Sequence, residues 1–204
     1  MKNPYLYLTL FILLTLNSCA KVYNSPDAVL LSRRHQQIAV LPPTATLPKK
    51  KDVSLEEQIN LEVAESENLQ REMIAWLLKR KMQNKIQVDI LDVSTSNARL
   101  LASGADLKTL TPKEKAELLE VDAVIVSNFK LSKPMSTGAA IATTLLFGFG
   151  NTNEINVSME LHDYKTGKLI WNFQHNLSGG LFSTSNQLVD EVMRIASKKL
   201  PYSK

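Results

Sequence analysis

Cysteine and histidine are scarce in this chain of 204 residues, which contains one cysteine and three histidines. A single cysteine excludes an intrachain disulfide and a cysteine-rich zinc site. Three histidines leave little material for metal binding or for acid–base chemistry. The formal net charge of +4 is too small to indicate a nucleic-acid-binding protein. With 44% hydrophobic and 22% charged residues, the composition is that of an ordinary folded protein with a binding or structural role.

A run of residues without charge, from Tyr5 to Leu16, lies close to the N-terminus. This run is too short to span a membrane, which takes about 20 residues, but it has the length of the apolar region of a secretory signal. The sequence Leu16-Asn17-Ser18-Cys19 then resembles the lipobox of bacterial lipoproteins. We therefore predict that residues 1–18 are a signal peptide and that Cys19 is lipidated. An uncleaved anchor with an incidental cysteine is the alternative.

Lipidation of Cys19 predicts where the protein resides. Two or three acyl chains hold a protein permanently on a membrane, since each buried methylene contributes about 0.8 kcal/mol. Ala20, rather than an aspartate, follows the cysteine. The usual sorting rule of two-membrane bacteria then predicts the cell outer membrane, with the folded domain in the periplasm. Residues 19–36 are mostly polar, contain Pro26 and show no sustained period, so we expect a tether there.

Helix and strand signals follow one another through residues 37–203, the predicted domain. Apolar or alternating patterns predict strands at residues 38–41, 86–90, 121–129, 153–162 and 168–178. Capping signals and apolar stripes predict helices at residues 54–85, 94–102, 111–120 and 184–200. Residues 44–52 are expected to be a solvated loop. This order predicts a single α/β domain with a mixed sheet of about five strands flanked by helices.

The last two predicted strands provide a test for a metal site. If residues 165–167 form a turn with glycine in the left-handed position, Val157 lies opposite His175. His162 and His175 then point to opposite faces of the sheet, because side chains alternate along a strand. These two histidines could not share a metal ion, and His35 lies in the expected tether. The pattern therefore predicts no metal site.

Motifs for catalysis and for cofactor binding are also missing. The sequence has no Gly-x-Ser-x-Gly elbow, and Gly148-Phe149-Gly150 lacks the further glycine and the lysine of a phosphate-binding loop. Carboxylates such as Glu56 and Glu57 stand at an expected helix start, where capping explains them. Asp122 and Asp163 are single acids at a strand start and at a turn. We predict that the protein is not an enzyme and binds no cofactor.

An uncharged stretch, residues 138–150, lies between two of the predicted strands. It begins with small residues and ends with bulky ones, a composition typical of close packing or of membrane contact. As a helix it is too short to span a bilayer. One interpretation is a buried crossover helix that links the strands; the other is an interface between copies or a surface that faces the bilayer. The residues that would make such a contact are Ile141, Leu145, Leu146, Phe147 and Phe149.

The order of these elements resembles bacterial outer-membrane lipoproteins of the CsgG/LpoB type, and small lipoproteins that share a TolB-N-terminal-like α/β domain. The resemblance rests on the segment 38–42 after the lipobox, on the segment 110–126, and on the turn Thr166-Gly167 before a strand with Trp171. It covers residues 38–200. The resemblance implies a mixed sheet with flanking helices, a non-enzymatic role and a place at the inner leaflet of the outer membrane.

The resulting hypothesis is an outer-membrane-anchored periplasmic lipoprotein that acts as a non-catalytic assembly or scaffold component of a cell-envelope or secretion complex. Its expected partners are the membrane, through the lipid, and envelope proteins, including further copies of itself, but not nucleic acid. The alternative is a lipoprotein regulator that docks on a peptidoglycan synthase and activates it. A tether of about 17 residues reaches at most roughly 55–60 Å, which is short for contact with the inner membrane.

Overall fold

A seven-stranded mixed sheet is the framework of the computed structural model, which describes residues 20–49, 53–132, 153–179 and 185–203. Its strands are Lys21–Asn24 (β1), Gln37–Val40 (β2), Thr44–Thr46 (β3), Asp89–Ile90 (β4), Ala123–Ser132 (β5), Asn153–Asp163 (β6) and Leu169–Gly179 (β7). Its helices are Ala28–Ser32 (α2), Leu55–Met82 (α3), Val93–Ala102 (α4), Pro112–Leu119 (α5) and Ser185–Ala196 (α7). The predicted single α/β domain with a mixed sheet is confirmed, with β1 and β3 added to the expected strands.

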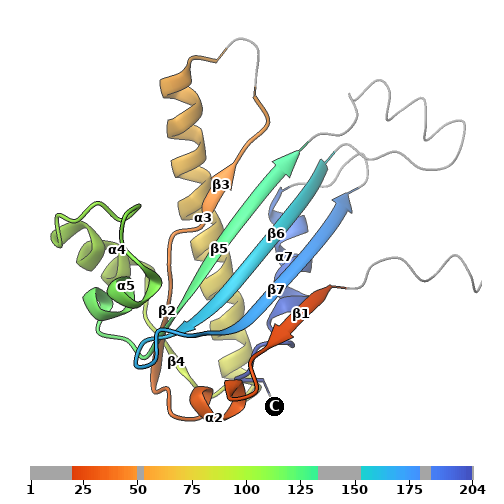
Figure 1. The fold of residues 1–204 in the computed structure, drawn as a ribbon. Coiled ribbons are helices and arrows are strands. Elements are labelled where there is room, and N and C mark those ends of the chain that lie inside the picture. The colour runs from red at the N-terminus through yellow and green to blue at the C-terminus, as the bar shows by residue number, and fades with distance from the viewer. Residues whose placement is uncertain (1–19, 50–52, 133–152, 180–184, 204) are drawn as a thin grey trace, which may run out of the picture.

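Six strands lie in the order β1-β7-β6-β5-β2-β4, and β3 continues along β5 past the end of β2 (Figure 1). β2 is parallel to β4 and to β5, whereas β5, β6, β7 and β1 are successive antiparallel neighbours. Antiparallel neighbours need no crossover connection. Residues 138–150 connect β5 to β6 and lie outside the described residues, so both interpretations of this stretch stay predictions.

The hairpin of β6 and β7 has the predicted register. Val157 lies opposite His175, and Gly167 adopts the left-handed conformation at φ +68° that closes the turn. The register shifts after Leu161, so that His162 pairs with Leu169. His175 consequently lies in the core, while His162 lies on the opposite face of the sheet.

Helix α3 begins where its capping signal predicts. The Ser54 hydroxyl accepts a hydrogen bond from the backbone N–H of Glu57 at 3.1 Å, which satisfies one donor of the first turn. Met73 and Leu77 in the second half of the helix are fully buried, whereas residues 55–68 include no buried residue. Among the described residues, α3 and the other helices are too polar or too short to cross a membrane.

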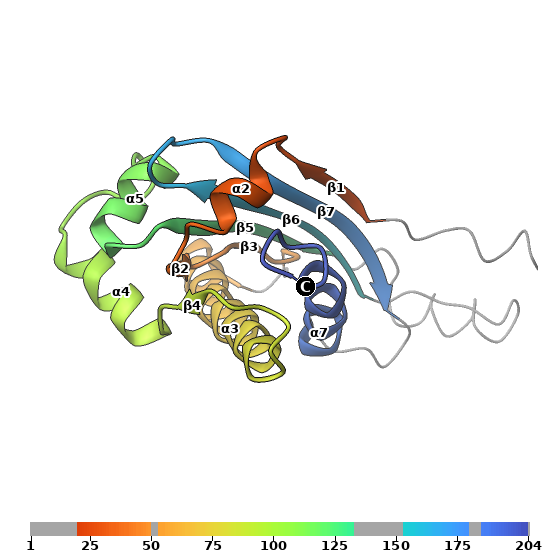
Figure 2. The same ribbon diagram turned by 90° about the horizontal axis from the view of Figure 1, so that it is seen from below.

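Helices cover both faces of the sheet, but unequally (Figure 2). α3 and α7 pack on one face and form the larger core with the inward side chains of β5, β6 and β7. α4 and α5 pack on the other face, against β2 and the start of β5. β2 separates the two cores, because Ile38 and Val40 belong to the larger one and Ala39 to the smaller one. Over β6, β7 and β1, the second face carries no helix of the described part of the chain.

The tether expected at residues 19–36 is wrong for most of that range. Lys21–Asn24 form the edge strand β1 on β7, and α2 packs into the larger core through Ala28 and Leu31. All four residues of β1 are exposed, so no alternation of apolar and polar residues marks this strand in the sequence. Helix α2 has only five residues, which is too short to show a helical repeat of apolar residues. The folded domain therefore begins near residue 21 rather than at residue 37.

Two further segments differ from expectation. Within the loop expected at residues 44–52, Thr44–Thr46 pair with β5, and Ala45 is buried against the sheet. Within the strand expected at residues 86–90, Asp89–Ile90 alone pair with β2, while the preceding apolar residues fill the core without pairing. In both cases tertiary packing, rather than local propensity, decides where backbone pairing occurs.

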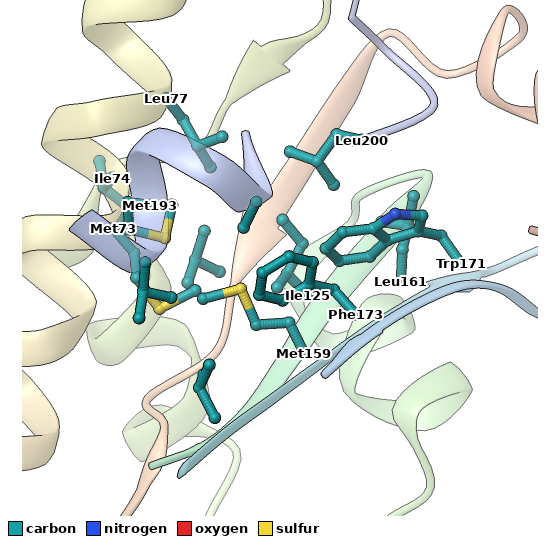
Figure 3. Close-up of a cluster of buried hydrophobic side chains, with 14 of the residues drawn as sticks. Met73, Ile74, Leu77, Ile125, Met159, Leu161, Trp171, Phe173, Met193 and Leu200 are labelled. Carbon is teal, nitrogen blue, oxygen red and sulfur yellow. The ribbon is translucent and has the colours of Figure 1, made fainter. Parts of the chain in front are cut away.

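Phe173 provides a test of the larger core. Its side chain is fully buried and stacks on Trp171 with ring centroids 5.9 Å apart (Figure 3). We expect Phe173→Ala to lower the free energy of unfolding by about 3–5 kcal/mol, since a large cavity remains. Urea denaturation measures the loss. Met82→Ala, at a position 85% exposed, should change stability by less than about 0.5 kcal/mol. Equal losses from the two variants would contradict the assigned core.

Candidate functional site

The residues predicted to contact a membrane or a partner lie outside the described residues. These residues are Cys19, Ile141, Leu145, Leu146, Phe147 and Phe149. Their flanks are described: Lys21 opens the edge strand β1, and Ser132 and Asn153 end two neighbouring strands at the same end of the sheet. Contact through the uncharged stretch stays a prediction.

An apolar groove, here called the α3–α4 groove, lies between the first half of α3 and α4. Its volume is about 760 Å³. The side chains of Ile59, Val63 and Leu101 are 50%, 55% and 83% exposed. Clustered aliphatic side chains with this exposure typically mark an interaction surface. The apolar walls of the groove are Pro42, Ile59, Val63, Leu100, Leu101 and Leu107.

Polar contacts hold the first half of α3 in place without burying its apolar side chains. The Glu62 carboxylate accepts hydrogen bonds from the backbone N–H of Leu47 and from the Gln58 amide, both at 3.1 Å. The Ser66 hydroxyl donates to the carbonyl oxygen of Pro43 at 2.5 Å. The helix is thus fastened to the segment around β3, and the groove stays open beside it.

The α3–α4 groove has an acidic border. Glu62 and Glu67 line it on the α3 side, and Lys108 lines it opposite. The surrounding half of α3, residues 55–68, contains five glutamates and neither lysine nor arginine. A complementary surface would therefore combine aliphatic side chains with positive charge.

A second surface is the uncovered face of β5, β6, β7 and β1, which is polar. One row across it joins Asn128, Ser158, Gln174 and Lys21 in direct register. Amide and hydroxyl groups with two lysines line a hollow of about 460 Å³, and no acidic residue of the described chain lines it. Antiparallel sheets commonly leave one face to water, so this polar face is stable without a cover.

A buried chain of hydrogen bonds joins His35, Asp163 and Tyr202. His35 Nε2 donates to the Asp163 carboxylate at 2.8 Å, and a hydrogen bond of 2.6 Å joins His35 Nδ1 to the Tyr202 hydroxyl. The direction of the first bond follows because a carboxylate only accepts. The side chains of His35 and Asp163 are 3% and 4% exposed. These two side chains are thus almost fully enclosed by the fold.

The electrostatics of this cluster favour a structural role. Burial works to raise the pKa of Asp163, but hydrogen bonds from Thr166 and His35 outweigh it and hold the pKa below the ordinary value of 3.8. Burial, with the charges of Asp163 and Asp122, raises the pKa of Tyr202 well above 10.0. The phenol therefore stays protonated. The cluster fastens the start of the domain, the β6–β7 turn and the C-terminal segment to one another.

The sequence pattern did not reveal this cluster, because its members are far apart in the chain. His35 lies in the segment expected to be a tether, and Asp163 looked like a single acid at a turn. In the described part of the chain, no group of three or more histidine, cysteine, aspartate or glutamate side chains is placed to hold a metal ion.

Comparisons with known proteins find the fold but no family. No protein-family model matches the chain, and no curated protein matches it. A PelC dodecamer from Paraburkholderia phytofirmans has a similar structure, with 10% identity and a TM-score of 0.52, over 92% of this chain and 99% of that chain. The chain thus shares the fold of a PelC subunit across nearly its whole length.

Two further solved structures are similar at lower scores. Lipoprotein GNA1162 from Neisseria meningitidis is 14% identical with a TM-score of 0.48, over 82% of this chain and 99% of that chain. The LpoB C-terminal domain from Escherichia coli is 12% identical with a TM-score of 0.36, over 74% and 93%. At these identities the likeness concerns the fold alone.

Asp163→Ala tests the structural role of the buried cluster. We expect the free energy of unfolding to fall by about 2–3 kcal/mol, because buried donors lose a charged acceptor. Chemical denaturation at neutral pH measures the loss. Asp106→Ala removes an exposed turn carboxylate that accepts from the Lys108 backbone N–H, and it should cost less than about 1 kcal/mol. A loss no larger than that of the control would refute the role.

His175 gives the stability a dependence on pH. Burial lowers the pKa of His175 below 6.5, against a smaller opposing effect of Glu191. The unfolded chain therefore binds the proton first, and this contribution to stability is complete above pH 6.5 and declines as the pH falls below it. We expect the unfolding free energy of His175→Leu to vary less between pH 7.5 and pH 5.5 than that of the wild type. An unchanged profile in His175→Leu would contradict the assignment.

Proposed function

We propose that this protein is a lipoprotein of the bacterial outer membrane, anchored through Cys19, and that it acts as a non-catalytic assembly or scaffold component of a cell-envelope complex. The observation that carries the proposal is the position of the first strand. β1 begins at Lys21, two residues after Cys19, and forms an edge of the sheet. Acyl chains on Cys19 would hold this edge directly on the bilayer surface.

The short distance between the lipid and the sheet favours assembly at the membrane. With Ala20 alone between Cys19 and Lys21, the chain allows at most about 7 Å of slack. A regulator that activates a synthase at the opposite membrane needs a long tether. This domain instead offers its surfaces at the membrane that holds it.

The fold and the candidate surfaces support the same proposal. The PelC subunit, whose fold this chain shares, forms a dodecamer. The α3–α4 groove provides an exposed apolar surface of the kind that subunits use to bind one another. The burial of the His35 and Asp163 side chains supports a non-catalytic role, since a catalytic group has to touch its substrate.

Replacement of Cys19 tests the anchor. Cells fed labelled palmitate should label the wild-type protein, which should fractionate with the outer membrane. Cys19→Ala should carry no label and should leave the membrane fraction, because no other residue receives the lipid. Ala20→Ser, a neighbouring change that keeps the cysteine, should retain both properties. Label in Cys19→Ala, or none in the wild type, would refute the anchor.

The assembly role is tested on the same wild-type protein. After mild detergent extraction, it should migrate in native electrophoresis as a complex well above the chain mass of 22.8 kDa. A wild-type protein that is monomeric and cross-links to no envelope component would refute the assembly role.

A further inference from the structure

The short helix α2 presents apolar side chains away from its own domain. Ala28 and Leu31 are buried, so Val29 and Leu30 lie on the outer side of the helix, where they are 54% and 57% exposed. A helix this short usually exposes polar residues on its outer side. Two adjacent exposed aliphatic side chains therefore need an explanation beyond the packing of α2 on the sheet.

Positive charge stands beside these aliphatic side chains. Arg33 and Arg34 follow α2 directly and are exposed. Neither arginine forms an ion pair with another described residue, whereas Asp27, at the start of the helix, is paired with Lys168 at 2.9 Å. We call the surface formed by Val29, Leu30, Arg33 and Arg34 the α2 patch.

The α2 patch complements the α3–α4 groove in both polarity and charge. The groove offers the exposed aliphatic side chains of Val63 and Leu101, and Glu62 and Glu67 border it. Glu67 makes one exposed contact within its own helix, 3.8 Å from Arg71, and such contacts contribute little. Apolar anchors surrounded by opposite charges are the usual composition of a protein interface.

We propose that the α3–α4 groove of one copy receives the α2 patch of a second copy, so that copies join head to tail. The two surfaces lie apart on one molecule: α2 lies at the end where α3 stops, and the groove lies along the half where α3 starts (Figure 1). Each copy therefore carries both halves of the contact. A contact between two different surfaces closes into a ring when the rotation between copies permits it.

A second copy is the occupant because this chain itself supplies the complement of the groove. The arginines of the α2 patch match the glutamates of the groove, and the aliphatic pair of the patch matches its apolar walls. This inference rests on the proposed assembly role and names the contact that would build the assembly.

Paired cysteines in the full-length protein test the contact. Leu30→Cys and Val63→Cys in the same chain should give a ladder of disulfide-linked dimers, trimers and larger species on mild oxidation of native membranes. Either substitution alone should give no ladder, because two identical surfaces do not meet in a head-to-tail contact. Leu30→Cys with Asn176→Cys, which is exposed on the uncovered sheet face, is the matched control and should stay monomeric on the denaturing gel.

Mixing of variants tests whether the link joins position 30 of one copy to position 63 of another. Cells that co-express a Leu30→Cys chain and a Val63→Cys chain should give linked dimers and no larger linked species. Val29→Asp, added to the chain with both cysteines, should abolish the ladder while leaving the thermal unfolding of the purified protein unchanged, because Val29 is 54% exposed and belongs to neither core cluster.

The outcomes separate this inference from the proposed function. A ladder from the double-cysteine chain and dimers from the mixture support the head-to-tail contact. A wild-type complex without a ladder, or a ladder equal to that of the Asn176→Cys control, overturns the contact and leaves the assembly role standing. A wild-type protein that is monomeric in native membranes overturns both.

Discussion

The burial of one face of the β5–β6–β7 meander beneath α3 and α7 is the constraint on which the rest of the structure depends. Side chains alternate along these strands, so an apolar inner face forces every second residue outward. The inner face stacks Trp171 on Phe173 and places Met159 against them (Figure 3). A shift of one residue would turn the whole set to water. The register of the hairpin, the position of α3 and the polar character of the second face all follow from this burial.

The proposed anchor at Cys19 would give this architecture its functional meaning. With the proposed lipid on Cys19, the domain would have the side of its edge strand committed to the bilayer surface, and its remaining sides would be free for neighbours. The antiparallel face presents amides and hydroxyls, which water can satisfy. The α3–α4 groove differs, because its exposed aliphatic side chains gain free energy when another surface covers them. Among the described surfaces, the groove and the α2 patch are therefore suited to assembly, and the sheet face is suited to solvent.

One cluster of buried polar side chains connects distant parts of the fold. His35, Asp163 and Tyr202 come from three distant parts of the chain, and their hydrogen bonds close the domain where its first helix, its hairpin turn and its last residues meet. A catalytic group needs access and a pKa near the working pH. Here burial and hydrogen bonding move the pKa values of Asp163 and Tyr202 away from that range. The burial and the shifted pKa values that suit a stabilising cluster are therefore the opposite of what a catalytic group needs.

The sequence by itself determined the period-two strands, the capped helices and the register of the last hairpin, because alternation, capping residues and the Thr166-Gly167 turn are local signals. The lipobox at Cys19 stays a prediction, because Cys19 lies outside the described residues. Tertiary structure alone decided that β1 joins the sheet, that His35 meets Asp163, and that exposed side chains of α3 border a groove. These features depend on which distant segments lie side by side. Exposed or very short segments have no hydrophobic periodicity from which their pairing could be predicted. Local sequence signals determined where helices and strands form. Long-range packing determined which of them lie side by side, and so created the surfaces through which the protein would act.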